Sequence, residues 1–206
     1  STGSFYKGKP SGSFGHLSAF SFYPTKNLGA YGDGGFVGTS SKKFAQRAKE
    51  LRKYGMRKSY YSNEHGINSR LDEVQAAIIN LKLKNLKNWI AQRRKIAETY
   101  NHLLKDTSLI LPEENKNNFH AYYAYVVRHK KRKYIMDKLK KKNIYCNISY
   151  PFPIHLMRGY SHLNYKENDF PVSEKCAKQI FSLPMYPQLK KKEILKVVKA
   201  LKNIGI

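Results

Sequence analysis

Acidic residues are scarce in this sequence of 206 residues. Lys and Arg number 39 against 14 Asp and Glu, which gives a formal net charge of +25. Such an excess is typical of proteins that bind nucleic acids or other anions. The lysine clusters, however, are spread over residues 130–133, 140–142 and 190–192, in or beside expected amphipathic helices where lysine faces solvent. We therefore expect anionic small molecules as ligands and regard nucleic acid as the weaker expectation.

Cysteine and long apolar runs are also scarce. The two cysteines, Cys146 and Cys176, match no metal-ligand spacing, and we interpret both as small core residues. No apolar run approaches the roughly 20 residues that cross a bilayer, and the first residues lack the apolar segment of a signal peptide. The sequence thus predicts a cytoplasmic protein with no membrane partner and no metal site.

The hydrophobic pattern predicts a mixed α/β fold. Alternation at period two predicts strands at residues 17–22 and 34–39, and a helix is expected at residues 42–53. Residues 71–105 carry apolar side chains at helical spacing with no proline, which predicts one long helix. Beyond Pro112 the pattern predicts strands at residues 122–127 and 143–148, and helices at residues 130–142, 172–181 and 190–204.

One segment near the start has the glycine spacing of a phosphate-binding loop. It reads Gly3-Ser4-Phe5-Tyr6-Lys7-Gly8-Lys9. Pro10 stands where such a loop needs a hydroxyl to bind magnesium, and no helix is expected to follow. We therefore expect a surface hairpin at this position.

Lys26 stands in a glycine-rich loop between the first two expected strands. Gly29, Gly32, Gly34 and Gly35 follow it and would let the backbone approach a bound ligand closely. A lysine that loses part of its hydration at the end of a buried strand becomes a nucleophile toward carbonyl groups. Spacing alone leaves two interpretations open, a functional lysine and an ordinary exposed loop lysine.

A set of motifs follows in order along the chain. They are Ser21-Phe22-Tyr23-Pro24-Thr25-Lys26-Asn27-Leu28-Gly29 with Gly32-Asp33-Gly34-Gly35, then Gly66-Ile67-Asn68-Ser69-Arg70-Leu71-Asp72-Glu73, Tyr150-Pro151-Phe152-Pro153-Ile154-His155, Phe170-Pro171-Val172-Ser173-Glu174, and Ser182-Leu183-Pro184-Met185-Tyr186-Pro187. In this order they resemble the sugar aminotransferases of the DegT/DnrJ/EryC/StrS family, which are fold-type I pyridoxal-phosphate enzymes.

The resemblance implies an architecture and a cofactor. The chain would be the C-terminal part of an α/β aminotransferase, with the remainder of the large cofactor-binding domain at residues 1–70, a long linking helix at residues 71–105 and a small α+β domain at residues 106–206. Lys26 would hold pyridoxal 5′-phosphate covalently and shuttle a proton during catalysis. A related branch that dehydrates sugars has histidine in place of this lysine, so Lys26 favours amino transfer.

The resemblance also implies roles for four further residues. Ser21 would bind the cofactor phosphate, and Asn68 would reach the phosphate in the neighbouring subunit's site, so that a homodimer would share its active sites. Tyr150 and His155 would contact the substrate. The residues themselves leave other interpretations open: Ser21 as an ordinary strand hydroxyl, Asn68 as the cap of a helix that starts at Arg70, and residues 150–155 as a rigid connection.

The expected reaction is transfer of an amino group, with glutamate as the donor, to a nucleotide-linked keto-sugar. The cofactor ring needs a carboxylate to keep its nitrogen protonated. Residues 1–32 contain no Asp or Glu, and in the family this aspartate precedes the lysine strand. We therefore expect a fragment that lacks the N-terminal half. Two other interpretations stay open, a catalytically inactive remnant of the family and a basic domain that binds nucleic acid.

Overall fold

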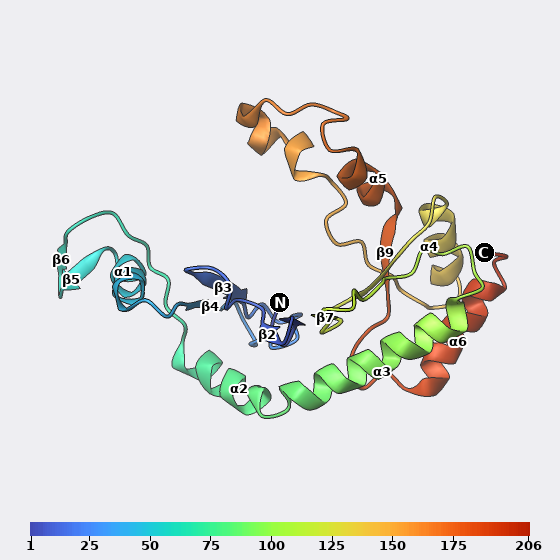
Figure 1. Ribbon diagram of the computed structural model, residues 1–206, viewed down its shortest axis with the longest axis horizontal. Coiled ribbons are helices and arrows are strands. Elements are labelled where there is room, and N and C mark those ends of the chain that lie inside the picture. Colours follow the sequence, from blue (N-terminus) through green and yellow to red (C-terminus); the bar gives the residue numbers. More distant parts are fainter. The chain divides into compact units, whose positions relative to one another are not determined.

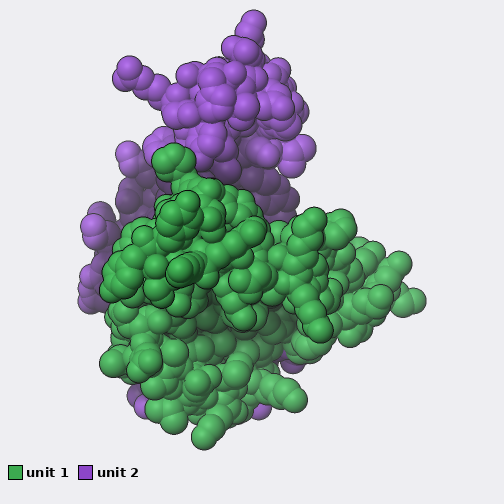
Figure 2. Space-filling model, turned by 90° about the vertical axis from the view of Figure 1, so that its left-hand side faces the viewer, with its two compact units in different colours: residues 1–91, 114–121 green, residues 92–113, 122–206 purple.

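The computed structural model describes residues 1–206, and the chain packs as two compact units (Figures 1 and 2). Unit 1 comprises residues 1–91 and 114–121, and unit 2 comprises residues 92–113 and 122–206. Each unit has its own cluster of buried apolar side chains. None of the helices combines the length and the hydropathy that a membrane crossing needs. The three-part division at residues 70 and 105 stays a prediction.

A small antiparallel sheet contains the start of unit 1. Strand β1 (Phe5–Tyr6) pairs with β2 (Lys9–Pro10) and with β7 (Asn118–Phe119). Between β1 and β2, Lys7 and Gly8 both have a positive φ, of 47° and 75°. Two successive residues with positive φ form the tight turn that joins antiparallel strands. The predicted hairpin is therefore confirmed.

A second pair of strands frames the loop that carries Lys26. Strand β3 (Ser18–Ser21) pairs antiparallel with β4 (Gly35–Gly38), so residues 22–34 form a loop at one end of this pair. Both strands were predicted from the period-two pattern. The next helix, α1 (Lys42–Leu51), begins after Ser41, whose hydroxyl accepts a hydrogen bond from the Phe44 N–H at 3.4 Å. A short hairpin of β5 (Met56–Lys58) and β6 (Tyr61–Ser62) follows.

The prediction of one long helix over residues 71–105 was wrong. The structure has two helices, α2 (Glu73–Leu83) and α3 (Leu86–Leu104). The Asn85 N–H donates to the Lys82 carbonyl at 3.0 Å, which closes a tight turn, and the Asn85 carbonyl then accepts the first hydrogen bond of α3 from Trp89. Asparagine often starts a helix because its side chain competes for backbone partners. The apolar spacing continues through this break and therefore conceals it.

Unit 2 is built around one antiparallel pair of strands. Strand β8 (Tyr125–Arg128) pairs with β9 (Ile180–Leu183). Helices α4 (Arg132–Lys140) and α6 (Lys191–Lys202) and the second part of α3 contribute to the same core. The short helices η1 (Ile154–Leu156) and η2 (Arg158–Leu163) and helix α5 (Pro171–Gln179) complete the unit. The largest fully buried side chains here are Tyr100, Leu104, Tyr125, Val127, Ile135, Leu139, Phe181 and Leu201.

The predicted elements of unit 2 are confirmed except around β9. The strand expected at residues 143–148 is absent, since only Asn147 forms an isolated bridge, to Ser182. The helix expected at residues 172–181 ends at Gln179, where the chain enters β9. Pairing with β8 buries Phe181 and Leu183 on one face of β9, and this tertiary contact outweighs the local helical pattern.

Phe181 gives a direct test of the unit 2 core. Its side chain is fully buried between the paired strand and the helices, so Phe181→Ala leaves a cavity. We expect the free energy of unfolding to fall by about 3–5 kcal/mol. The control Val172→Ala, at a position that is 73% exposed, is expected to change it by less than about 0.5 kcal/mol. Urea unfolding of both variants measures the difference, and equal effects would contradict this description of the core.

Candidate active site

The loop of residues 22–34 is closed at its base by backbone hydrogen bonds. The Phe22 N–H donates to the Gly34 carbonyl at 2.8 Å, and the Ala30 N–H donates to the Phe22 carbonyl at 2.7 Å. Inside the loop, the Lys26 N–H donates to the Tyr23 carbonyl at 2.9 Å. Lys26 thus lies in a defined turn, and its side chain is half-buried.

The segment that follows Lys26 is anchored in the unit 1 core. Leu28 and Ala30 are buried in a cluster that includes side chains of α2 and α3. The Lys82 ammonium of α2 donates to the Gly29 carbonyl, and the Asn27 amide donates to the Ala121 carbonyl at 3.2 Å. The backbone next to Lys26 is therefore fixed by apolar packing and by two hydrogen bonds, one to α2 and one to Ala121.

The glycines of this loop are required by close contacts. A Cβ atom on Gly29 would lie 2.4 Å from the Pro24 carbonyl oxygen, so only glycine fits there. A Cβ on Gly34 would lie 2.9 Å from Leu71. The backbone N–H of Tyr31 donates to the Gln75 side chain of α2 at 2.8 Å. The glycine-rich sequence thus allows the loop to pack tightly against the residues before and within α2.

Ser21 lies at the end of β3, directly before the Lys26 loop. Its exposed hydroxyl oxygen accepts a hydrogen bond from the Tyr23 N–H at 3.2 Å. Because that bond uses only a lone pair, the hydroxyl proton can still be donated to an anion. The structure thus places Ser21 at the base of the loop that carries Lys26. The buried side-chain oxygen of Asn27, the residue after Lys26, has no hydrogen-bond partner.

Asn68 lies outside this loop, on a separate segment of unit 1. Its side-chain oxygen accepts a hydrogen bond from Arg70 Nε at 3.0 Å, and its amide nitrogen carries two further N–H donors. The interpretation of Asn68 as the cap of a helix starting at Arg70 is wrong, because α2 begins at Glu73 with Asp72 as its N-cap. Asn68 instead forms an isolated bridge with Lys53.

Tyr150 and His155 lie in unit 2 and differ in exposure. Tyr150 is 77% exposed and has a left-handed φ of 60°, a strained backbone for a tyrosine. The His155 side chain is buried, with Nε2 3.0 Å from Glu174 Oε1 and its ring packed edge-on against Phe170. His155 therefore ties the loop to the first turn of α5, while Tyr150 is open to a ligand.

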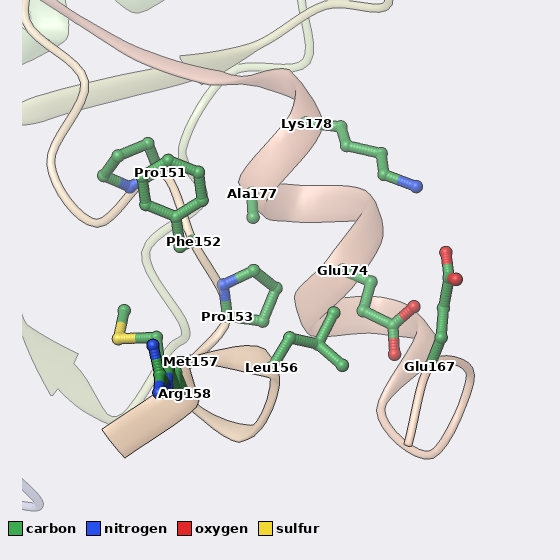
Figure 3. A pocket seen from close by; sticks show the side chains of 10 residues that line it. All are labelled: Pro151, Phe152, Pro153, Leu156, Met157, Arg158, Glu167, Glu174, Ala177 and Lys178. Atoms are coloured by element: carbon green, nitrogen blue, oxygen red, sulfur yellow. The ribbon is translucent and has the colours of Figure 1, made fainter. Parts of the chain in front are cut away.

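A cavity of about 550 Å³ lies between this loop and α5 (Figure 3). Its loop side is mainly apolar, and charged side chains lie among its lining. The lining residues are Pro151, Phe152, Pro153, Leu156, Met157, Arg158, Glu167, Glu174, Ala177 and Lys178. The contact between His155 and Glu174 therefore forms part of the support of this cavity.

The His155 contact also affects the ionisation of Glu174. Burial acts to raise the pKa of Glu174, but hydrogen bonds from His155 and from the backbone N–H groups of Asn168 and Phe170 outweigh burial. The net result is a pKa below the usual value, so the carboxylate form is favoured in the folded protein.

Sequence reasoning missed the residues that hold these loops in place. Asn27 and Glu174 stand inside the quoted motifs, but their partners cannot be read from the motifs. Ala121, the partner of Asn27, is distant in the chain, and no periodic pattern connects His155 with Glu174. Lys82 is one lysine among many, and nothing in the sequence distinguishes it. Only the fold shows which of the basic residues carries a structural bond.

Comparison with known proteins identifies the family. Residues 1–202 match the DegT/DnrJ/EryC1/StrS aminotransferase family. The chain belongs to this family. Its members are PLP-dependent, and the fold is the C-terminal part of a fold-type I aminotransferase.

Individual relatives of the DegT/DnrJ/EryC1/StrS family agree over almost the whole chain. The dTDP-3-amino-3,4,6-trideoxy-alpha-D-glucose transaminase of Micromonospora megalomicea subsp. nigra is 44% identical over 96% of this chain and 54% of its own length. A pleiotropic regulatory protein of Geobacillus stearothermophilus is 41% identical over 97% of this chain and 54% of its own. DesV of S. venezuelae, solved in complex with a ketimine intermediate, superposes with a TM-score of 0.93 at 35% identity, over 98% of this chain and 55% of DesV. The chain thus spans about half the length of the relatives it matches.

The lowered pKa of Glu174 predicts a pH-dependent contribution to stability. A depressed pKa means that the carboxylate stabilises the folded state above its usual pKa of 4.5 and that this contribution is lost as the pH falls through the folded-state value. We therefore expect Glu174→Gln to destabilise the protein at pH 7 and to have a smaller effect near pH 3.5. Urea midpoints at both pH values measure this, with Glu167→Gln, an exposed neighbour, as control. An effect of Glu174→Gln that does not change with pH would contradict the assignment.

Proposed function

We propose that the protein transfers an amino group, with glutamate as donor, to a nucleotide-linked keto-sugar, and that it acts as a homodimer with shared active sites. The observation that carries this proposal is the Lys26 loop: a half-buried lysine whose following residues are fixed by Leu28, Ala30 and the Lys82 bond to Gly29. The Micromonospora relative named above, a dTDP-amino-sugar transaminase, supports the class of acceptor.

The residues of the Lys26 loop fit pyridoxal 5′-phosphate. When bound, this cofactor supplies the electron sink for carbanion chemistry. The Lys26 amine would hold it covalently and, once displaced by the donor, carry a proton to and from the reacting carbon. The closed turn at Tyr23 and the buried segment after Lys26 limit the lysine to side-chain movement, so that its amine returns to the same place.

Two hydrogen-bond donors are proposed for the cofactor phosphate. The Ser21 hydroxyl, at the start of the same loop, has a proton to donate. Asn68, with its oxygen bound to Arg70, presents its amide N–H groups, and we assign them to the phosphate in the neighbouring subunit's site. The site would then be incomplete without a second copy of the chain.

The carboxylate for the cofactor ring nitrogen is not among residues 1–32. Because the chain spans about half the length of its relatives, we propose that this carboxylate belongs to the other half of the enzyme. The isolated chain would then bind the cofactor less firmly than the full gene product, or remain inactive.

The exposed Tyr150 and the buried His155 divide the proposed substrate role between them. Tyr150, with its open ring and strained backbone, would contact the sugar substrate. His155 would act mainly by holding the Tyr150 loop on α5 through Glu174, because its Nε2 is already engaged there. The positive net charge favours the approach of an anionic nucleotide sugar.

Labelling of Lys26 tests the proposed function. The full gene product is titrated with pyridoxal phosphate, reduced with borohydride and mapped by peptide mass analysis. We expect an absorbance band of the bound cofactor, and a label confined to Lys26. Lys26→Ala should abolish both, together with amino transfer, whereas Lys133→Ala on an exposed face of α4 should leave them unchanged.

Two results would overturn the proposed function. Labelling spread over many surface lysines, or an absorbance band that persists in Lys26→Ala, would exclude a specific lysine site. Binding of nucleic acid that falls steeply with salt and is indifferent to Lys26→Ala would instead support the alternative of a basic nucleic-acid-binding domain.

A further inference from the structure

The segment that carries Asn68 is fixed to the end of α1 by its backbone. The N–H groups of Ile67 and Ser69 donate to the carbonyls of Leu51 and Arg52 at 2.8 and 3.0 Å. Asn68 therefore lies between two backbone hydrogen bonds. Since its side chain is exposed, its position depends on how residues 52–69 are held.

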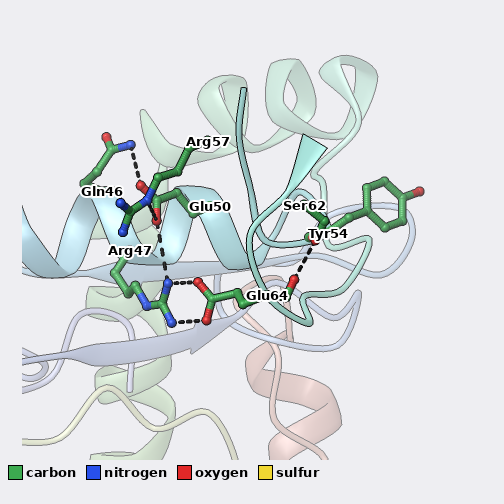
Figure 4. Close-up of polar contacts among 7 residues, drawn as sticks. All are labelled: Gln46, Arg47, Glu50, Tyr54, Arg57, Ser62 and Glu64. Carbon is green, nitrogen blue, oxygen red and sulfur yellow. Dashed lines mark hydrogen bonds and ion pairs between the residues drawn. The ribbon is translucent and has the colours of Figure 1, made fainter. Parts of the chain in front are cut away.

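Glu50 is the centre of the polar contacts that hold residues 52–69 (Figure 4). It is 5% exposed, in the last turn of α1. Its carboxylate accepts a hydrogen bond from Arg57 Nε at 3.1 Å and from Gln46 Nε2 at 3.1 Å, and Arg47 lies 3.6 Å from it. The Glu50 backbone carbonyl also accepts the N–H groups of Lys53 and Gly55, both at 3.0 Å. Glu50 thus directs both the turn out of α1 and the strand β5 that contains Arg57.

A second carboxylate extends these contacts to the far side of the loop. Arg47 forms an ion pair with Glu64, and the Ser62 hydroxyl lies within hydrogen-bond distance of the Glu64 carbonyl (Figure 4). Just beyond Glu64, a Cβ atom on Gly66 would lie 2.1 Å from the Gly55 nitrogen, so the two sides of the loop touch backbone to backbone. These contacts fix the path of the backbone from Glu64 back to the end of α1, directly before Asn68.

We propose that Glu50 is a positioning residue, whose carboxylate holds residues 52–69 so that the Asn68 amide is presented to the cofactor phosphate. This inference rests on the proposed function. Glu50 itself would touch neither cofactor nor substrate. The influence of its carboxylate passes through Arg57 in β5 and through Arg47, which also binds Glu64.

The charges around Glu50 explain why a neutral replacement would loosen this segment. The basic side chains Arg47 and Arg57 both face its carboxylate. The hydrogen bond from Gln46 and the two arginines lower the pKa of Glu50 despite its burial, which is consistent with a carboxylate that is ionised in the folded protein. In Glu50→Gln the side chain keeps its size and can still accept a hydrogen bond, but the negative charge that Arg47 and Arg57 share is lost.

The experiment compares Glu50→Gln with a matched charge control in the full gene product. The control is Glu98→Gln, an exposed carboxylate on α3, which changes the net charge equally. Arg57→Gln removes the other partner at a position that is 67% exposed, and it keeps the test available if Glu50→Gln does not fold. The measurements are amide hydrogen exchange at Ile67 and Ser69, and the affinities for pyridoxal 5′-phosphate and for pyridoxal, which lacks the phosphate.

We expect Glu50→Gln to lower the protection of the Ile67 and Ser69 amides. We also expect it to weaken pyridoxal 5′-phosphate binding about tenfold, by analogy with the loss of metal affinity when a residue that orients a metal ligand is replaced. The affinity for pyridoxal should be unchanged. Arg57→Gln should lower amide protection and pyridoxal 5′-phosphate affinity in the same direction but by less, and Glu98→Gln should match the wild type. A loss that is equal for both ligands would mean general unfolding and would overturn the positioning role.

Failure of this inference can be told from failure of the proposed function. Unchanged exchange at Ile67 and Ser69 in Glu50→Gln would overturn the inference even if Lys26 is labelled by the cofactor. If exchange rises but phosphate-specific binding does not fall, the link from Glu50 to the cofactor is overturned. Loss of the Lys26 label in the wild type would instead refute the proposed function.

Discussion

The pairing of two buried carboxylates with side chains of neighbouring segments holds the stretch that follows α1 and the loop that lies against the start of α5. Glu50 lies in the last turn of α1 and Glu174 in the first turn of α5, and each binds partners from the adjacent loop. A buried charge without a partner is costly, so each carboxylate fixes the side chains that approach it. Because the chain has 14 acidic and 39 basic residues, a carboxylate has many possible basic partners. The positions of the few buried carboxylates therefore determine where a loop is held.

The Lys26 loop is held in a different way, which suits the absence of acids from residues 1–32. Apolar packing of Leu28 and Ala30 fixes its second half, and donors from α2 and from Asn27 bind to carbonyl groups. Backbone carbonyls supply partial negative charge without the net charge of a carboxylate. These contacts hold the loop without using a carboxylate, which would compete with an anionic ligand for the donors.

The sequence predicted the strands on both sides of Lys26, because their alternating pattern matches the period of a half-buried strand. It also predicted α1, α4 and α6, where apolar side chains recur at helical spacing. It missed the break at Asn85, which interrupts the backbone hydrogen bonds but not the apolar spacing. It also missed β9, whose four residues become a strand only through pairing with β8, more than 50 positions away along the chain.

For the site, the motifs led to Lys26, Ser21 and Asn68 through resemblance, and the roles of these residues stay predictions. The anchors could not be found in this way. Glu50 and Lys82 act through bonds to distant or irregular segments, and no spacing rule connects a carboxylate in α1 with Arg57 in β5 or a lysine in α2 with Gly29. Motifs report which side chains a reaction needs, whereas the residues that hold them depend on how the chain closes on itself.

Arg93 in the unit 2 core is likewise held by backbone carbonyls and not by a carboxylate. Its side chain is buried, and burial lowers its pKa, yet its Nη1 lies 3.0–3.2 Å from the carbonyls of Tyr122, Tyr123 and Met185. These carbonyls come just before β8 and just after β9, so one guanidinium joins both strand ends to α3. The guanidinium stays charged in proteins, and here Nη1 makes all three contacts while the buried Nε has no hydrogen-bond partner. Where a buried cation is needed in this chain, carbonyl dipoles replace the carboxylate, and the buried carboxylates Glu50 and Glu174 are left to fasten loops.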